Sequence, residues 1–415
     1  MTDDTLISLP CIPSDLVALL VEQAYLAGGG RLALVGGAVR DAMLHYEHRD
    51  RLFGPKDFDF VLEGSCAAFV QHLQDQYSNQ RLSECRFHER YSTAEFAFDG
   101  VLIDLASART EIYPAPGENP LVKAASIEQD LARRDFSVNA MGLLFCEDGS
   151  LHLCDPFNGR EHLAKRELVF LHEASVADDP TRIVRGARYG ARLGFNLAPE
   201  ALSQIQSTIA LWPWAWQPGD SLDAVPPALG TRLRMELELL LDLEPTYDAL
   251  KLLQQWSAMP LLDVGLQNEP RISRRLIQAK RLGLPALSVL VAAASDPVSL
   301  AMRLQVPRQQ QIWLEALIDL RCWLELEVKP YPWGLWGALD WTQRLEQMGW
   351  PPEAVALAVL DSTPFRRPLL HWWGRWRHVR SPWSARELIA QGMSPGPALG
   401  DELKRLREQD LRKMR

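Results

Sequence analysis

The sequence of 415 residues has no paired cysteines, no long apolar run and no excess of positive charge, and each absence excludes a class of protein. Its six cysteines form no Cys-x-x-Cys pair, so neither a disulfide framework nor a zinc site is indicated, and we expect buried, reduced thiols in a cytoplasmic protein. The longest apolar run, at residues 284–294, is too short to span a bilayer, and the acidic N-terminus lacks the cationic start of a secretory signal. The net charge of −9 excludes a uniformly basic nucleic-acid binder but is compatible with a locally basic groove.

Tryptophan is absent from the first half of the chain, because all 14 tryptophans lie after residue 211. This break in composition indicates at least two regions of different architecture. The first region alternates short apolar runs with helical stretches, which predicts a small sheet with helices, an α+β arrangement. From about Asp179 the pattern is helical, apart from a segment at 212–227 that is rich in proline and glycine and predicts a loop.

Short local motifs predict where individual helices and strands begin and end. The Asp-Gly dipeptide at 99–100 favours a type I′ hairpin turn, and Ser126 opens a helix with the spacing of a capping box. The Asp-Pro pair at 179–180 starts another helix, which Gly194 ends. The predicted strands cover residues 32–35, 58–62, 94–98, 101–105 and 151–155. The predicted helices cover residues 66–77, 179–194, 232–243, 272–282, 308–326 and 341–348.

A glycine turn at residues 35–41, with the sequence Val-Gly-Gly-Ala-Val-Arg-Asp, follows the first predicted strand and enters a helix. Backbone N–H groups at such a helix start form a ready site for phosphate, and glycine lets a bulky anion approach closely. Gly-Gly after a strand is, by itself, more often a plain tight turn. The acids that follow favour the phosphate site.

Asp57 and Asp59 stand two residues apart on a predicted strand, so their side chains share one face. Two neighbouring carboxylates repel each other unless a cation lies between them, and Mg²⁺ takes carboxylates together with phosphate oxygens. Asp104, inside the apolar run 101–105, is a candidate third carboxylate. The alternative for Asp57 and Asp59 is a solvent-facing pair without a ligand.

Together these residues resemble the head motif of the class II tRNA nucleotidyltransferases and bacterial poly(A) polymerases, within the polymerase-beta-like nucleotidyltransferase superfamily. Further segments resemble that family in the same order, and the specific resemblance covers about residues 30–240. They are residues 106–117, 130–141 (the arginine-arginine-aspartate motif), 155–166, 178–195 and, more weakly, 232–237 and 387–400. The resemblance implies a nucleotidyltransferase head at 1–150, a neck with a nucleotide-selecting helix at 151–245, a helical body at 246–330 and a helical tail at 331–415.

The resemblance also implies the reaction and its residues. An RNA 3′-hydroxyl would attack the α-phosphate of CTP or ATP and release pyrophosphate, with Mg²⁺ held by Asp57 and Asp59. Asp104 would complete the catalytic set, Asp57, Asp59 and Asp104. The expected nucleotide-binding residues are Gly36, Gly37, Arg40, Arg134, Asp135, Asn139, Asp179, Arg182, Arg185 and Arg188. Arg133, Arg134 and Asp135 are expected on one helix, where a solvated charged face is the alternative.

Asp179 and Arg182, at positions i and i+3, face the same side of the expected helix start. An aspartate accepts and an arginine donates, so together they match the edges of cytosine and adenine. In the family, residues at these positions select C and A without a nucleic-acid template. The structural alternative is an N-cap aspartate in a salt bridge with Arg182.

The tail has the best candidates for contacts with tRNA. The stretch 372–380 interleaves tryptophans with cations, although tryptophans at such spacing more often fill a helical core. The candidate RNA-binding residues are Arg375, Arg377, Arg380, Lys404 and Arg405. For residues 404–415 a solvated helix of mixed charge is an equal alternative.

The predicted function is therefore addition of C, A or both to the 3′ end of tRNA, with no membrane partner and with the oligomeric state left open. A poly(A) polymerase shares the head and is the nearest alternative. The full loop at 109–125 argues against an enzyme that adds only C, and it does not separate CCA addition from A addition. Two further alternatives are an inactive RNA-binding homologue, against which the intact acids and arginines argue, and a nucleotidyltransferase acting on a substrate other than RNA.

Overall fold

The computed structural model describes residues 14–50, 58–78, 80–89, 92–146, 150–361 and 363–414. The chain forms two compact units. Unit 1 comprises Met1–Trp214, Val225–Glu236 and Glu244–Ala258, and unit 2 comprises Ala215–Ala224, Leu237–Leu243 and Met259–Arg415. The α+β class expected from the sequence is confirmed. The division into four domains stays a prediction.

Unit 1 contains a seven-stranded mixed sheet in the order β3-β4-β5-β2-β1-β8-β9. Only β2 and β5 pair in parallel, and every other neighbouring pair in this sheet is antiparallel. The strands are β1 (Leu32–Val35), β2 (Phe58–Leu62), β3 (Leu82–His88), β4 (Thr93–Phe98), β5 (Val101–Ser107), β8 (Gly142–Phe145) and β9 (Leu151–Cys154). Asp99 and Gly100 both have positive φ, as a type I′ turn requires, so the predicted hairpin of β4 and β5 is confirmed.

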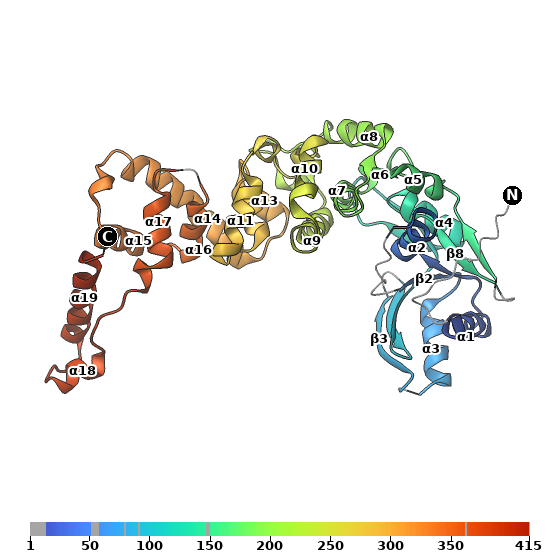
Figure 1. Cartoon of the computed structure of the whole chain (residues 1–415), viewed down its shortest axis with the longest axis horizontal. Coiled ribbons are helices and arrows are strands. Elements are labelled where there is room, and N and C mark those ends of the chain that lie inside the picture. Colours follow the sequence, from blue (N-terminus) through green and yellow to red (C-terminus); the bar gives the residue numbers. More distant parts are fainter. Residues whose placement is uncertain are drawn as a thin grey trace. The chain divides into compact units, whose positions relative to one another are not determined.

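The helices of the head cover this sheet (Figure 1). They are α1 (Ser14–Leu26), α2 (Gly37–His48), α3 (Cys66–Gln76) and α4 (Ile127–Ala132). Ile127 and Leu131 of α4 pack on Val35 and Val61 of the two central strands, which seats α4 directly against the sheet. Ser126 makes the expected capping box with Gln129. A separate two-stranded ribbon, β6 (Arg109–Ile112) with β7 (Leu121–Ala124), leads into α4.

Arg133, Arg134 and Asp135 lie beyond the end of α4, and the expectation that they share a helix is wrong. The helix stops at Ala132, and residues 133–135 form an irregular turn before Phe136 bridges to Phe170. Both arginines still reach Asp130, and Arg133 also pairs with Glu111.

The rest of unit 1 is helical, apart from the short parallel pair β10 (Glu167–Leu168) and β11 (Asn196–Leu197). Its helices are α5 (Gly159–Lys165), α6 (Ser175–Asp178), α7 (Thr181–Leu193), α8 (Pro199–Ile209) and α10 (Thr246–Gln255). Helix α9 (Pro227–Leu243) has its first ten residues in unit 1 and its remainder in unit 2. Gly194 ends α7 in the left-handed conformation, as predicted.

Unit 2 is helical, and tryptophan side chains pack in its interior. Its helices after α9 are α11 (Ile272–Leu282), α12 (Ala286–Ala292), α13 (Pro297–Arg303), α14 (Arg308–Trp323), α15 (Ala338–Met348), α16 (Pro352–Val359), α17 (Arg366–Gly374), α18 (Ala385–Ala390) and α19 (Pro397–Arg412). Helix α14 ends three residues earlier than predicted, and a π-helical turn, Leu324–Val328, follows it. Trp341 is buried at the centre, with Trp336 at 5.2 Å and Phe365 at 6.4 Å between ring centroids.

Tryptophans of the predicted loop at 212–227 and of the stretch 372–380 lie mostly in the protein interior. Trp214, Trp216, Trp372 and Trp376 are buried, whereas Trp212 is exposed. Arg303 lies 3.7 Å above the ring of Trp216, and burial lowers the pKa of this arginine to about 10. Within the stretch 372–380, the core interpretation is therefore confirmed for Trp372 and Trp376.

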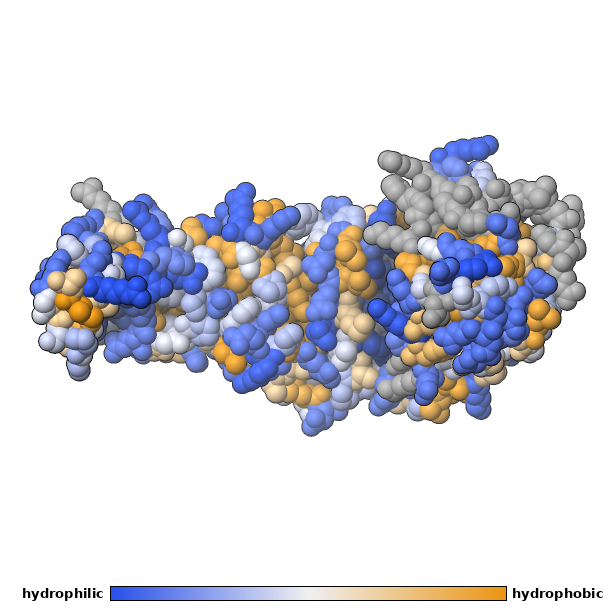
Figure 2. All heavy atoms as spheres, turned by 90° about the horizontal axis from the view of Figure 1, so that it is seen from below, coloured by the Kyte–Doolittle hydropathy of each residue, from blue (hydrophilic) through white to orange (hydrophobic). Residues whose placement is uncertain are grey.

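No helix among the described residues is long and apolar enough to cross a membrane. On the face drawn in Figure 2, hydrophilic and hydrophobic residues are mixed over small areas.

Candidate active site

The glycine turn at the start of α2 lies close to the carboxylate of Asp59. Gly36 has φ +74°, a conformation that favours glycine. A Cβ atom there would lie 3.2 Å from Nη1 of Arg134 and 3.4 Å from Oδ2 of Asp59. Any side chain at residue 36 would therefore occupy the space between an arginine and a carboxylate, which explains why glycine is needed.

The acids stand side by side because β2 and β5 are parallel. Asp59 of β2 is in register with Asp104 of β5, and Asp104 is in register with Glu95 of β4. All three line a cavity of about 310 Å³, together with Arg109 and Arg134. Asp57 lies outside the described residues. The described residues contain no group of three or more His, Cys, Asp and Glu side chains able to hold a metal ion.

A larger cavity of about 760 Å³ lies next to the glycine turn and shares Asp59 and Arg134 with the smaller one. Its lining includes all ten predicted nucleotide-binding residues, which come from the glycine turn, α2, the segment 133–139, α7 and, just before α7, Asp179. These residues are Gly36, Gly37, Arg40, Arg134, Asp135, Asn139, Asp179, Arg182, Arg185 and Arg188. The structure thus brings together residues up to 152 positions apart in the chain.

Several arginines of this cavity keep buried N–H groups that have no hydrogen-bond partner among the described residues. They are Nε of Arg134, Nη1 of Arg182, Nε of Arg185 and Nε of Arg232. Burial lowers the pKa of Arg134 and opposes the attraction of Asp130. Buried cationic donors without partners are costly, and an anion with several oxygens would satisfy them.

A chain of polar contacts links residues that line the larger cavity. Arg40 is buried and donates through Nη1 to Oδ1 of Asn139 at 2.8 Å, and Nδ2 of Asn139 donates to Oδ1 of Asp135 at 3.1 Å. Arg185 forms an ion pair of 2.8 Å with Oδ2 of Asp135. Burial by itself would raise the pKa of Asp135, but the attraction of Arg185 and the hydrogen bond from Asn139 outweigh it and hold the pKa below the ordinary value. Asp135 is therefore ionised and held in place.

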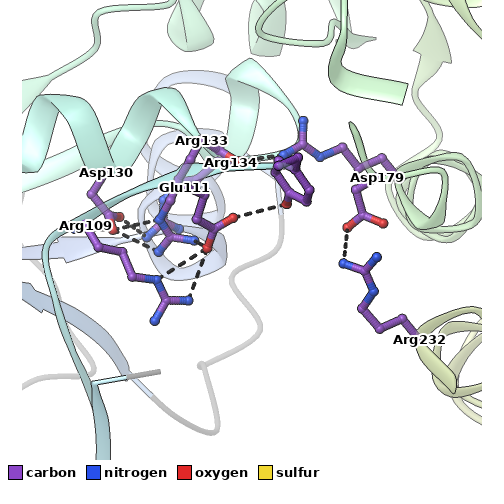
Figure 3. Close-up of polar contacts among 9 residues, drawn as sticks. Arg109, Glu111, Asp130, Arg133, Arg134, Asp179 and Arg232 are labelled. Carbon is purple, nitrogen blue, oxygen red and sulfur yellow. Dashed lines mark hydrogen bonds and ion pairs between the residues drawn. The ribbon is translucent and has the colours of Figure 1, made fainter. Parts of the chain in front are cut away.

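A second network ties the β6–β7 ribbon to the turn after α4 (Figure 3). Glu111 of β6 pairs with Arg133 at 2.9 Å and with Arg109 at 3.2 Å, and it accepts a hydrogen bond from the Tyr113 hydroxyl at 3.1 Å. Burial raises the pKa of Tyr113, and the negative charges of Glu111 and Asp179 raise it further. Asp130 accepts from Arg133 and Arg134 and so fixes the direction of both.

The start of α7 is fixed by its own side chains. Oδ1 of Asp179 accepts from the backbone N–H of Thr181 at 3.2 Å and from its hydroxyl at 2.8 Å. The N-cap of α7 is Pro180, one residue later than expected, so Asp179 holds the turn before the helix and does not cap it. Arg182 is buried and donates through Nη2 to the carbonyl of Arg133 at 2.8 Å. The structure pairs Asp179 with Arg232 at 3.7 Å, not with Arg182 as the structural alternative assumed.

Arg188 forms ion pairs that the sequence did not predict. It pairs with Glu236 of α9 and, at 3.2 Å, with Glu244, so two carboxylates balance its charge. Arg188 still lines the cavity. Its ion pairs join α7 to α9 and to the segment before α10.

The predicted RNA-binding residues all lie in unit 2. Arg375, Arg380 and Lys404 are exposed, whereas Arg405 is paired with Glu402 at 2.6 Å. Arg377 stacks 3.9 Å from the Trp373 ring and donates to the Trp373 carbonyl. Their contact with RNA stays a prediction.

Sequence reasoning missed the contributions of several residues that line the two cavities. They are Glu95, Arg109, Glu111, Tyr113, Arg133 and Arg232. The alternation of charge at Arg109 and Glu111 is a visible signal, because residues two apart on a strand share a face. For Arg232 the sequence gives only the weak resemblance at 232–237 and does not reveal its partners, which lie 53 and 115 positions away.

Three comparisons place this chain among known proteins. Residues 32–169 match the family model described as the poly(A) polymerase head domain. A CC-adding tRNA nucleotidyltransferase of Deinococcus radiodurans is 32% identical over 90% of this chain and 83% of its own length. An A-adding tRNA nucleotidyltransferase of Halalkalibacterium halodurans is 34% identical over an alignment that covers 61% of this chain and 55% of the relative.

Among solved structures, a CCA-adding enzyme in an apo form aligns with a TM-score of 0.71 at 20% identity, covering 97% of this chain and 93% of its own. The Thermotoga maritima CCA-adding enzyme in complex with tRNA aligns with a TM-score of 0.64 at 20% identity, covering 96% of this chain and 90% of its own. These structures show the same fold. The match to the Deinococcus relative over most of both chains shows the family: this chain belongs to the class II tRNA nucleotidyltransferases and is a nucleotidyltransferase enzyme.

Proposed function

We propose that the protein adds C, A or both, from CTP and ATP, to the 3′ end of tRNA, with release of pyrophosphate. The observation that carries the proposal is the position of Asp59, which lines two cavities of different character. This carboxylate lines both a cavity with Asp104 and a cavity rich in buried arginines. Nucleotidyl transfer needs acids at the α-phosphate and cations at the leaving pyrophosphate, side by side.

The donor set fits Mg²⁺. Asp59 and Asp104 present carboxylates from neighbouring strands in register, and carboxylates are the ligands this ion prefers. Asp59 and Asp104, with the predicted Asp57, would hold the ion. When bound, it would lower the pKa of the attacking hydroxyl and neutralise charge on the phosphates.

The arginines support a triphosphate in the larger cavity. Arg134 approaches the Gly36 turn, and the unpartnered N–H groups of Arg134 and Arg185 offer donors for phosphate oxygens. Asp135 is ionised and is held by Asn139 and Arg185, so it can accept a hydrogen bond from a ribose hydroxyl. That acceptor would favour ribonucleotides over deoxyribonucleotides.

The start of α7 supports selection of C and A. Arg182 has one guanidinium nitrogen committed to the Arg133 carbonyl and another, Nη1, without a partner among the described residues. Asp179 has one oxygen bonded to Thr181, the first residue of α7, and the other facing Arg232. An acceptor and a free donor at one helix start match the ring nitrogen and the amino group that cytosine and adenine share.

The test offers labelled CTP and labelled ATP separately to tRNA that ends at the discriminator base, after C, or after CC. Addition of both nucleotides in order indicates a CCA-adding enzyme, and addition of ATP only after CC indicates an A-adding one. Addition of C only would agree with the name of the Deinococcus relative and would contradict the expectation drawn from loop 109–125. Long A tails on unrelated RNA would indicate a poly(A) polymerase, and no incorporation would overturn the proposal.

A further inference from the structure

A single 3₁₀ turn, Ser137–Asn139, lies next to the aspartate that is proposed to bind the ribose. Asn139, at the end of the turn, donates to Oδ1 of Asp135 at 3.1 Å, and the backbone N–H of Phe136 donates to the same oxygen at 2.8 Å. Both donors move with the turn. The orientation of the Asp135 carboxylate therefore depends on where the turn is held.

Ser137 fixes the first residue of this turn through two of its atoms. The residue is buried, and its backbone N–H donates to the carbonyl of Val169 at 3.0 Å. Its hydroxyl oxygen lies 2.7 Å from Nδ1 of His162, in a hydrogen bond whose donor is set by the tautomer of the ring. Ser137 is not among the described residues that line the two cavities, so it can act on a nucleotide only through the turn.

Helix α5, which carries His162, is itself held tightly against the turn. The carboxylate of Asp155 accepts from the backbone N–H of Gly159 at 2.7 Å and so fixes the start of the helix. A Cβ at residue 159 would collide with the carbonyl oxygen of Ser137, so this close approach requires glycine. His162 stands three residues after Gly159, on the face of α5 that contacts the turn.

The contact between His162 and Ser137 has a specific geometry. A buried hydroxyl that loses its hydrogen-bond partner costs free energy, so the turn is expected to shift when the ring nitrogen is removed. The bonded atom is Nδ1, the ring nitrogen nearer the backbone. An asparagine amide reaches about as far from the backbone as Nδ1, whereas a glutamine amide extends further, towards the position of Nε2.

We propose that His162 is a positioning residue for ribose recognition. Through Ser137 it holds the turn that orients Asp135, and it thereby contributes to the preference for ribonucleotides over deoxyribonucleotides. This inference rests on the proposed function, because it takes Asp135 as the acceptor for the ribose 2′-hydroxyl.

The experiment measures kcat and KM of the full-length protein for the nucleotide that the wild type adds and for its 2′-deoxy form. In His162→Phe, which keeps a ring but removes the nitrogen, we expect kcat/KM for the ribonucleotide to fall about fivefold, the effect of one hydrogen bond. The loss should appear mainly as a higher KM, because the ribose contact is made in the bound substrate before the reaction. For the deoxynucleotide kcat/KM should change less than about twofold, because the hydroxyl that Asp135 would bind is absent.

Two substitutions of similar polarity test the geometry. His162→Asn should restore most of the preference for the ribonucleotide, because its amide can reach the Ser137 hydroxyl. His162→Gln should restore little of it. This pair decides the question even if His162→Phe does not fold.

Ser137→Ala removes the other partner of the hydrogen bond. It should lower the preference as His162→Phe does, and the double variant should be no worse than either single one, because both remove the same contact. His152→Phe is the matched control. His152 also contacts a serine hydroxyl, that of Ser150 at 3.3 Å, but it is exposed and lies outside the lining of the two cavities, so its loss should leave the preference unchanged.

Each outcome decides between positioning and general damage. If His162→Phe lowers kcat/KM equally for both nucleotides, or if the asparagine and glutamine variants behave alike, the inference is overturned while the proposed function stands. A wild type that uses both nucleotides equally would overturn the inference together with the ribose role of Asp135. Absence of incorporation by the wild type would overturn the proposed function itself.

Discussion

The two units differ in the kinds of side chain that they bury. The interior of unit 1 contains charged residues, among them Arg40, Asp130, Asp135 and Arg182, whereas the centre of unit 2 is filled by aromatic rings around Trp341. Burying a charge costs free energy unless partners compensate it, and burying a tryptophan is favourable. Buried charges that cost free energy are often found where a protein binds a ligand or catalyses a reaction. The proposed reaction is therefore assigned to unit 1. Unit 2 also buries a carboxylate, Asp263, and its stability is expected to depend mainly on packing.

The strongest test removes an acid from unit 1. Asp59→Ala should reduce nucleotide incorporation by about four orders of magnitude or more, because a carboxylate at the reacting phosphate contributes several kcal/mol. Asp57→Ala should do the same. The thermal unfolding of both variants should match the wild type. Normal incorporation by either variant would refute the assignment of the acids, and with it the comparison of the units.

The complementary change removes a ring from unit 2. Trp341→Ala should destabilise the protein by about 3–5 kcal/mol, because the buried ring leaves a cavity among its aromatic neighbours. Denaturant unfolding followed by tryptophan fluorescence gives the loss. Trp212→Ala is the control, since Trp212 is exposed and its removal should change stability by less than about 0.5 kcal/mol. Equal effects of the two changes would contradict the role of packing in unit 2.

An intermediate effect concerns the buried charge of Asp135. Its pKa lies below the ordinary value of 3.8, so its ionised form contributes stability that is complete above that pH. That contribution is lost as the pH falls through the lower pKa of the folded state. Asp135→Asn should cost about 1–3 kcal/mol near pH 7 and should flatten the acid limb of the stability curve. An unchanged acid limb would show that Asp135 is not ionised in the fold.

The smallest expected effect tests whether unit 2 also holds RNA. Arg375→Gln and Arg380→Gln should each reduce the slope of log affinity for tRNA against log salt concentration by about one. Both side chains are exposed, so their removal should leave the fold unchanged. Arg405→Gln should change the slope less, because Glu402 already pairs with Arg405. Identical slopes for all variants would remove the tail from the RNA-binding surface.

Local chemistry made much of this structure predictable from the sequence. Strands β1 and β2, the type I′ turn, the capping box at Ser126 and the Gly194 end of α7 each depend on residues within a few positions. The ten predicted residues among those that line the larger cavity were identified through a resemblance and not through spacing. The end of α4 before Arg133 was missed because its residues retain helical propensity, and the pairing of Phe136 with Phe170 in the folded chain overrides it.

The contacts of Arg188 and Arg232 were beyond sequence reasoning for a different reason. Their partners come from segments distant in the chain, Glu236 and Glu244 for Arg188 and Gly117 and Asp179 for Arg232. A single sequence carries no signal for such pairs, since surface and buried arginines look alike until the fold joins them.

Helix α9 has a practical consequence for anyone who wishes to divide this enzyme. Because the border between the units runs through a continuous helix, and residues 244–258 return to unit 1, no single cut in the gene separates one unit from the other. A fragment that stops before residue 225 would lose the arginine that reaches Asp179. Shortened versions should therefore end after residue 258 or keep the whole chain.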